Sequence, residues 1–188
     1  FLGTYNLLEA ALNNGVKRVN LPSSIAVFGP DAQKFNTPND VSLKPVSLYG
    51  VSKVYGEVIG NYYWQLGLDV RGVRLPGIIS WKTEPTAGTT DYAVAIFYGA
   101  IKKCHYTCYL QPDTRLPMMY MPDAISSLIE LDEAKPISLT HRADFNVHAM
   151  SFSPNELASE IAKQRPGFTI DYVIDPIRQS IADSWPDS

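Results

Sequence analysis

The sequence predicts an α/β fold, a Rossmann-like doubly wound parallel sheet whose first strands are missing, with a smaller C-terminal substrate-binding region. Segments with the period of a helix alternate with short apolar segments along the first half of the chain. Parallel strands need a crossover helix to return to the same edge of a sheet, so this alternation indicates a parallel sheet. The length of 188 residues and the 45% hydrophobic content are sufficient for a real core.

The first half contains two helix-and-strand units in order. Residues 1–14 have the pattern of an amphipathic helix that ends at Gly15, and residues 17–24 have the alternation of a strand. A polar, proline-containing segment follows as a long loop over residues 29–45. The next unit is a helix over 47–66 and a buried strand over 68–75 that Pro76 and Gly77 are expected to end.

The second half is expected to cover the substrate. The pattern predicts helices at about 91–103, 122–134 and 154–165, and strands at 106–110, 116–120 and 169–173. The third of these helices begins with a capping box, Ser153 to Glu156. We therefore divide the chain into residues 1–80, the C-terminal half of a dinucleotide-binding domain, and residues 81–188, a substrate-binding region whose strands return to the main sheet.

Composition excludes several classes of protein. A net charge of −3 without a Lys/Arg cluster argues against a nucleic-acid partner. The apolar runs are too short for a membrane span, and the two cysteines form no disulfide framework, which favours a reducing intracellular compartment. Cys104, His105 and Cys108 are too few ligands for a usual zinc site.

Tyr49 and Lys53 are the residues that carry a chemical signal. They lie four positions apart on the predicted helix, so both side chains leave the same face. An ammonium near a phenol favours the phenolate, which makes tyrosine a base. Ser24 lies at the C-terminal end of the preceding strand, where open α/β sheets bind ligands, and its hydroxyl could hold the substrate oxygen. A Tyr-x-x-x-Lys pattern alone is weak evidence for a catalytic site. Here it occurs together with a strand that ends at Ser24, a long loop, Gly50 directly after the tyrosine, and a following strand that ends at Pro76 and Gly77, which strengthens the interpretation.

Two strings, residues 23–29 (SSIAVFG) and 49–53 (YGVSK), resemble the extended short-chain dehydrogenase/reductases. Within that family the second half resembles the epimerase-like L-threonine 3-dehydrogenases. This resemblance rests on PGIIS (76–80), GTTDYA (88–93), LPMMYM (116–121), AMSFSP (149–154), and IADSWP (181–186).

The resemblance implies an NAD-dependent oxidation of L-threonine at C3 to 2-amino-3-oxobutanoate. Tyr49 would be the general base, Lys53 would assist it and bind the nicotinamide ribose, and Ser24 would orient the substrate hydroxyl. Thr89, Thr90 and Asp91 match the substrate-binding turn, and Ile78 matches a residue beside the nicotinamide. The family also implies a homodimer through the helices at 1–14 and 47–66. We expect no metal, nucleic acid or membrane, and a location in the cytoplasm of a bacterium or the mitochondrial matrix of a eukaryote.

The usual cofactor-binding turn is absent from these residues. The twelve glycines are never closer than four positions, so no G-x-G or G-x-x-G string exists to approach a pyrophosphate. We therefore expect a piece of an enzyme that lacks segments at both ends and is inactive alone. Two alternatives stay open: a nucleotide-sugar epimerase or dehydratase of the same family, and an inactive fragment that acts only in dimerisation. The residues alone do not separate NAD from NADP.

Overall fold

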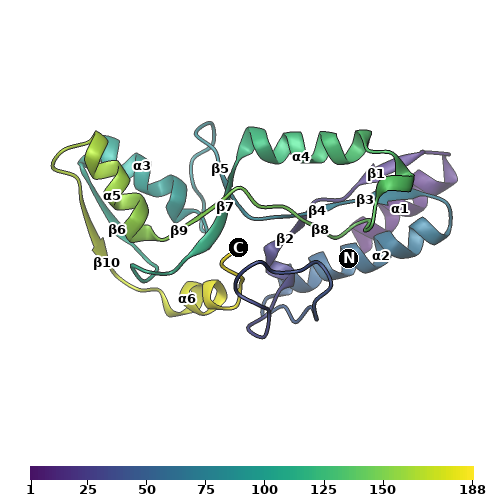
Figure 1. Cartoon of the computed structure of the whole chain (residues 1–188), viewed down its shortest axis with the longest axis horizontal. Coiled ribbons are helices and arrows are strands. Elements are labelled where there is room, and N and C mark those ends of the chain that lie inside the picture. The colour runs from purple at the N-terminus through teal and green to yellow at the C-terminus, as the bar shows by residue number, and fades with distance from the viewer.

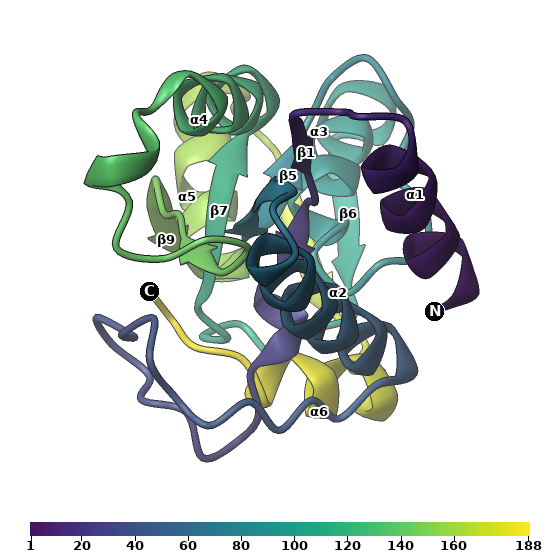
Figure 2. The same cartoon turned by 90° about the vertical axis from the view of Figure 1, so that its right-hand side faces the viewer.

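Parallel strands form the centre of one end of the molecule, with helices on both faces (Figure 1). The computed structural model describes residues 1–188. Strand β1 (Arg18–Asn20) pairs with β3 (Asp69–Arg71). Strand β4 (Val73–Leu75) lies between β2 (Ser23–Ser24) and β8 (Phe145–Asn146) and pairs with both. Helices α1 (Leu2–Asn13) and α2 (Leu48–Gln65) lie on one face and α4 (Met121–Glu133) on the other (Figure 2). The predicted Rossmann-like α/β fold is confirmed.

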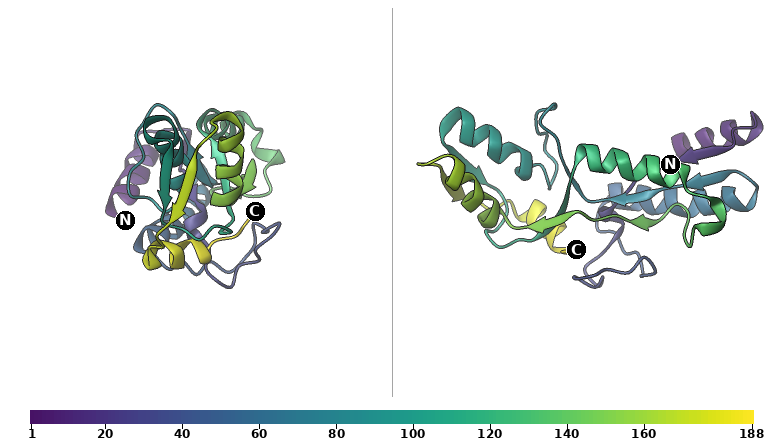
Figure 3. Two further views of the ribbon diagram at one scale, coloured as in Figure 1. Left: turned by 90° about the vertical axis from the view of Figure 1, so that its left-hand side faces the viewer. Right: turned by 45° about the horizontal axis from the view of Figure 1, so that its top comes forward.

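The opposite end is built by β5, at the end of the first half, and by most elements of the second half. Its elements are β5 (Gly77–Ile79), α3 (Tyr92–Lys103), β6 (His105–Cys108), β7 (Leu116–Tyr120), β9 (Met150–Phe152), α5 (Pro154–Gln164), β10 (Thr169–Tyr172) and α6 (Pro176–Asp183). Strand β7 lies between β5 and the antiparallel β9, and β6 pairs with β10. Short 3-10 helices η1 (Ile25–Val27) and η2 (Pro136–Ser138) complete the fold. The two ends lie along one long axis, with the C-terminus near its middle (Figure 3).

The structure corrects several sequence-based boundaries. The strand predicted over 17–24 is divided into β1 and β2 on either side of Leu21 and Pro22. The strand predicted to end before Pro76 resumes as β5. Proline has no N–H to donate to a strand ladder. Pro76 lies between β4, which pairs with β2 and β8, and β5, which pairs with β7, so the chain changes its partner strands at this residue. A strand is expected between His141 and His148, where β8 lies, but strand β9 and helix α6 are not predicted.

Three buried clusters form the core. The largest is centred on Phe28, Tyr92, Leu110 and Met118, where η1 packs against the second half. A second fixes α1 and α2 to the main sheet through Leu8, Tyr63 and Val70, among others. A third joins α3 to α5. The site described below lies where the first cluster connects the two ends.

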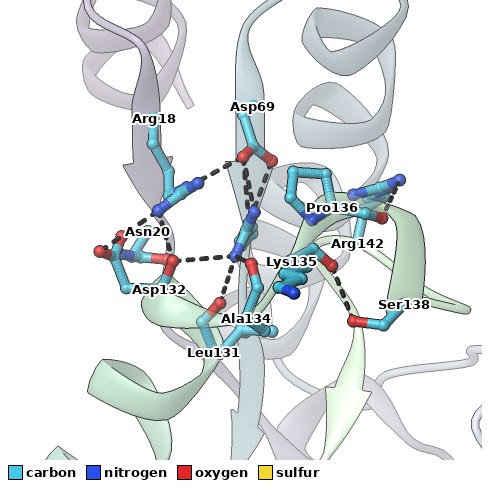
Figure 4. A network of polar contacts seen from close by, with 11 residues as sticks. Arg18, Asn20, Asp69, Leu131, Asp132, Ala134, Lys135, Pro136, Ser138 and Arg142 are labelled. Carbon is cyan, nitrogen blue, oxygen red and sulfur yellow. Dashed lines mark hydrogen bonds and ion pairs between the residues drawn. The ribbon is translucent and has the colours of Figure 1, made fainter.

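A buried arginine fastens α4 to the main sheet (Figure 4). Arg71 is fully buried, and its guanidinium binds Asp69 at 2.8 Å while Arg18 binds the same carboxylate at 2.9 Å. Arg71 Nη1 also donates to three carbonyl oxygens at the end of α4, those of Leu131, Asp132 and Ala134. Terminal carbonyls have no partner within a helix, and a cation there is favourable.

Candidate active site

A cleft of about 460 Å³ lies between the C-terminal edge of the main sheet and the second half. Of the seven predicted site residues it brings together six, from four separate segments: Ser24, Tyr49, Ile78, Thr89, Thr90 and Asp91. Lys53 does not line this cleft, but an adjoining pocket of about 220 Å³ that it shares with Pro22, Ser23 and Glu57. Residues whose role was not predicted complete the cleft: Ile25, Ser47, Pro76, Gly77, Ala87, Gly88, Ile181 and Trp185.

Tyr49 and Lys53 lie on the first two turns of α2. Ser47 caps this helix, since its Oγ accepts a hydrogen bond of 3.1 Å from the backbone N–H of Gly50. The Tyr49 side chain is exposed, and the ammonium of Lys53 lies 5.4 Å from the centre of its ring. Lys53 Nζ donates to the carbonyl oxygen of Pro22 at 2.8 Å. An ammonium has three hydrogens, so two remain for a ligand.

Ser24 lines the same cleft as Tyr49, next to a very close approach between two backbone segments. Its Oγ accepts a hydrogen bond of 3.2 Å from the N–H of Ala26, which leaves its own O–H free to donate. The α2 helix approaches this segment at Gly50, where a Cβ would lie 2.1 Å from the carbonyl oxygen of Ala26. Only glycine fits there, and this residue, directly after Tyr49, lets the start of α2 approach the segment that follows Ser24.

The turn before α3 is held from two sides. The Asp91 carboxylate accepts hydrogen bonds of 2.6 Å from both the N–H and the hydroxyl of Thr86, so one of its oxygens is used inside the loop. From below, Tyr109 Oη donates to the carbonyl oxygen of Gly88 at 2.8 Å. Burial raises the pKa of Tyr109, which keeps the phenol a donor. Arg178 of α6 stacks on the Tyr109 ring at 4.2 Å.

Sequence reasoning did not assign these supporting residues to the site. Thr86 contacts Asp91 within one loop, whereas Tyr109 and Arg178 meet through the pairing of β6 with β10 and the packing of α6, which no local pattern encodes. One signal was available: Asp175 followed by Pro176 is a typical helix start, and the Asp175 carboxylate does cap α6. That helix brings Ile181 and Trp185 to the cleft.

The model of the NAD dependent epimerase/dehydratase family matches residues 1–110, more than half of the chain. The chain belongs to this family. The family description and the cleft at the edge of a parallel sheet agree with the fold that the sequence predicted. Cys108 lies outside this cleft, buried in the core. The structure contains no group of three or more His, Cys, Asp or Glu side chains that could hold a metal ion.

Relatives of this family extend the comparison over nearly the whole chain. A mitochondrial L-threonine 3-dehydrogenase of Bos taurus is 48% identical over 185 residues, which are 98% of this chain and 49% of the relative. The chain thus spans about half the length of that relative. An L-threonine dehydrogenase from Clostridium difficile is 51% identical with a TM-score of 0.95, over 99% of this chain and 58% of that one. A monomeric L-threonine 3-dehydrogenase from a metagenome is 45% identical with a TM-score of 0.94, over 99% and 60%.

No helix of this chain is long and apolar enough to cross a membrane.

Proposed function

We propose that the protein carrying this chain is an NAD-dependent L-threonine 3-dehydrogenase. The observation that carries the proposal is the cleft in which six of the seven predicted site residues meet, although they come from segments far apart in the sequence. The relatives named L-threonine dehydrogenase or L-threonine 3-dehydrogenase, at 45–51% identity, support the choice of substrate. The division at residue 80 into a cofactor part and a substrate part belongs to this proposal.

Proton transfer is assigned to the residues on α2 and β2. Ser24 donates its O–H to the C3 oxygen of L-threonine and holds it beside Tyr49, whose phenolate removes the hydroxyl proton. The Lys53 ammonium, 5.4 Å from the centre of the Tyr49 ring, supplies a positive charge beside the base. A free hydroxyl on Ser24 and an exposed Tyr49 ring fit these roles.

The cofactor is assigned to Lys53, Tyr49 and Ile78. The two remaining hydrogens of the Lys53 ammonium fit ribose hydroxyls, and Ile78 gives the cleft an apolar wall. When bound, NAD supplies the acceptor for the hydride that leaves C3. Thr89, Thr90 and Asp91 hold the amino acid, with the second carboxylate oxygen of Asp91 available to an ammonium group.

The test is NADH formation with L-threonine by the intact protein that carries this chain, and by its Tyr49→Phe variant. We expect turnover by the parent and loss of turnover in Tyr49→Phe without a change in thermal unfolding temperature. A parent that oxidises nucleotide sugars but not L-threonine would overturn the substrate assignment. That outcome is disfavoured because the chain offers only Lys82 between Ser80 and the turn at Gly88 to bind a diphosphate.

A homodimer through α1 and α2 is a second part of the proposal. These helices lie side by side and expose Leu2, Tyr5, Val51, Val58 and Tyr62, an apolar surface of the kind that marks interfaces. Because one similar dehydrogenase is described as monomeric, the fold does not fix the assembly. Sedimentation should give a dimer for the parent and a monomer for Val58→Glu, with Ile137→Glu, at an exposed site on η2, as the matched control. A monomeric parent would contradict the inference.

A further inference from the structure

One ion pair is buried between helix α2 and strand β4 of the main sheet. Arg74 donates two parallel hydrogen bonds to the Glu57 carboxylate, from Nε to Oε1 at 2.9 Å and from Nη2 to Oε2 at 2.8 Å. Their side chains are only 3% and 4% exposed. Removing two charges from water costs several kcal/mol per ion, and an apolar pair of the same volume often stabilises a protein equally well. Stability alone therefore does not explain why charges stand here.

Glu57 connects the helix of the predicted base to the strand of the predicted serine. It lies one turn after Lys53 on α2, and its Oε1 accepts a hydrogen bond of 2.5 Å from Ser23 Oγ. Lys53 itself binds the carbonyl oxygen of Pro22 at 2.8 Å. Lys53 and Glu57, on two successive turns of α2, thus bind Pro22 and Ser23, the two residues directly before Ser24, which lines the cleft.

Arg74 extends this set of hydrogen bonds to the long loop and to β8. It lies opposite Ser23 in the β2–β4 register, four residues before Ile78. Its Nη1 donates to the carbonyl oxygen of Asn39, in the long loop, at 2.9 Å, and to Asn146 of β8 at 3.1 Å. One guanidinium therefore binds three segments: α2, which carries Tyr49, the long loop, which leads to Ser47, and β8.

We propose that Glu57 and Arg74 are positioning residues that hold Ser24 and Lys53 in register for proton transfer and cofactor binding. The proposal rests on the proposed function of Ser24, Tyr49 and Lys53. Neither Glu57 nor Arg74 lines the cleft, so they act through their neighbours. A displacement of about 1 Å in a reacting group can cost about 100-fold in rate.

The test replaces both charges together, with Glu57→Met and Arg74→Leu in one variant of the intact protein. Because no charge is left unpaired, we expect an unfolding temperature near that of the parent. We expect kcat with L-threonine to fall by about 10- to 100-fold, KM to change much less, and the Kd of NADH to rise. A variant with the stability, kcat and NADH affinity of the parent would overturn the proposal.

Two further variants keep the test decisive if the double replacement does not fold. Ser23→Ala removes only the bond to Glu57, and it should lower kcat in the same way at nearly unchanged stability; parent-like kcat there would overturn the proposal. Arg71→Met lowers stability at a buried ion pair that does not contact the site, so it should leave kcat and the Kd of NADH unchanged. A fall in kcat in Arg71→Met equal to that in the double variant would also overturn it.

The NADH measurement separates this proposal from the proposed function. If the parent binds NADH but does not oxidise L-threonine, the substrate assignment fails, and the positioning role is still judged by the NADH affinity of the double variant. If the parent is active and the double variant keeps parent-like NADH affinity and kcat, the positioning role alone fails.

Discussion

Replacing Gly50 by alanine tests the geometry on which the site depends. The new Cβ would lie 2.1 Å from the carbonyl oxygen of Ala26 and 2.6 Å from Cβ of Pro45, whereas real Cβ contacts do not fall below 3.0 Å. The first contact must therefore open by 3.0 − 2.1 = 0.9 Å. Since the carbonyl belongs to backbone that directly follows Ser24, the shift separates Tyr49 from Ser24. A misplacement of about 1 Å predicts a loss of about 100-fold in kcat.

The assay compares kcat with L-threonine and the thermal unfolding temperature of the intact protein. Overpacking of this kind costs about 1–3 kcal/mol, so Gly50→Ala should also unfold at a lower temperature. Gly3→Ala is the matched control, because Gly3 lies in helix α1, lines neither the cleft nor the pocket beside Lys53, and a Cβ there meets no atom within 4 Å. Alanine is favoured over glycine inside a helix by about 1 kcal/mol, so the control should be as stable as the parent or more so. A Gly50→Ala variant with parent-like kcat and unfolding temperature would refute the reasoning.

Three further perturbations follow from buried groups. Arg71→Met leaves the carbonyls at the end of α4 without this donor and leaves Arg18 as the one partner of Asp69, and should lower the free energy of unfolding by about 3–5 kcal/mol in urea titrations. Lys102→Met, which breaks an exposed pair, should cost less than about 1 kcal/mol. Burial raises the pKa of Asp69, but hydrogen bonds from Arg71 and Arg18 outweigh it and hold the pKa below its ordinary value. The contribution of the Asp69 carboxylate to the free energy of unfolding is therefore present above the unfolded pKa of about 4, and it is lost as the pH falls through the lower folded pKa. Asp69→Asn should flatten the acid limb of a curve of stability against pH, and an unchanged limb would contradict this. Tyr109→Phe removes the donor beneath the turn at Gly88 and should raise KM for L-threonine by about tenfold, whereas an unchanged KM would show that the turn does not need it.

Elements with short-range causes were predictable from the sequence. The helix at Pro154 was expected from its capping box, and both reciprocal bonds between Ser153 and Glu156 are present. The α2 helix begins within a residue of its predicted start because Ser47 caps it. Tyr49 and Lys53 share a face because helix geometry alone requires it. The alternation of helices and strands also sufficed to predict a parallel sheet.

Neighbours across the sheet were decided only by the tertiary structure. The pairing of Glu57 with Arg74, the contact of Tyr109 with Gly88 and the place of α6 beside the cleft depend on strand register and on packing between distant segments. Likewise Pro76 was expected to end a strand, but whether the chain stops or changes partner depends on which strand offers an open edge. The sequence by itself determined which side chains each local element presents. The tertiary structure decided which of them meet, because contacts between distant segments are fixed by the packing of the whole core and not by any local pattern.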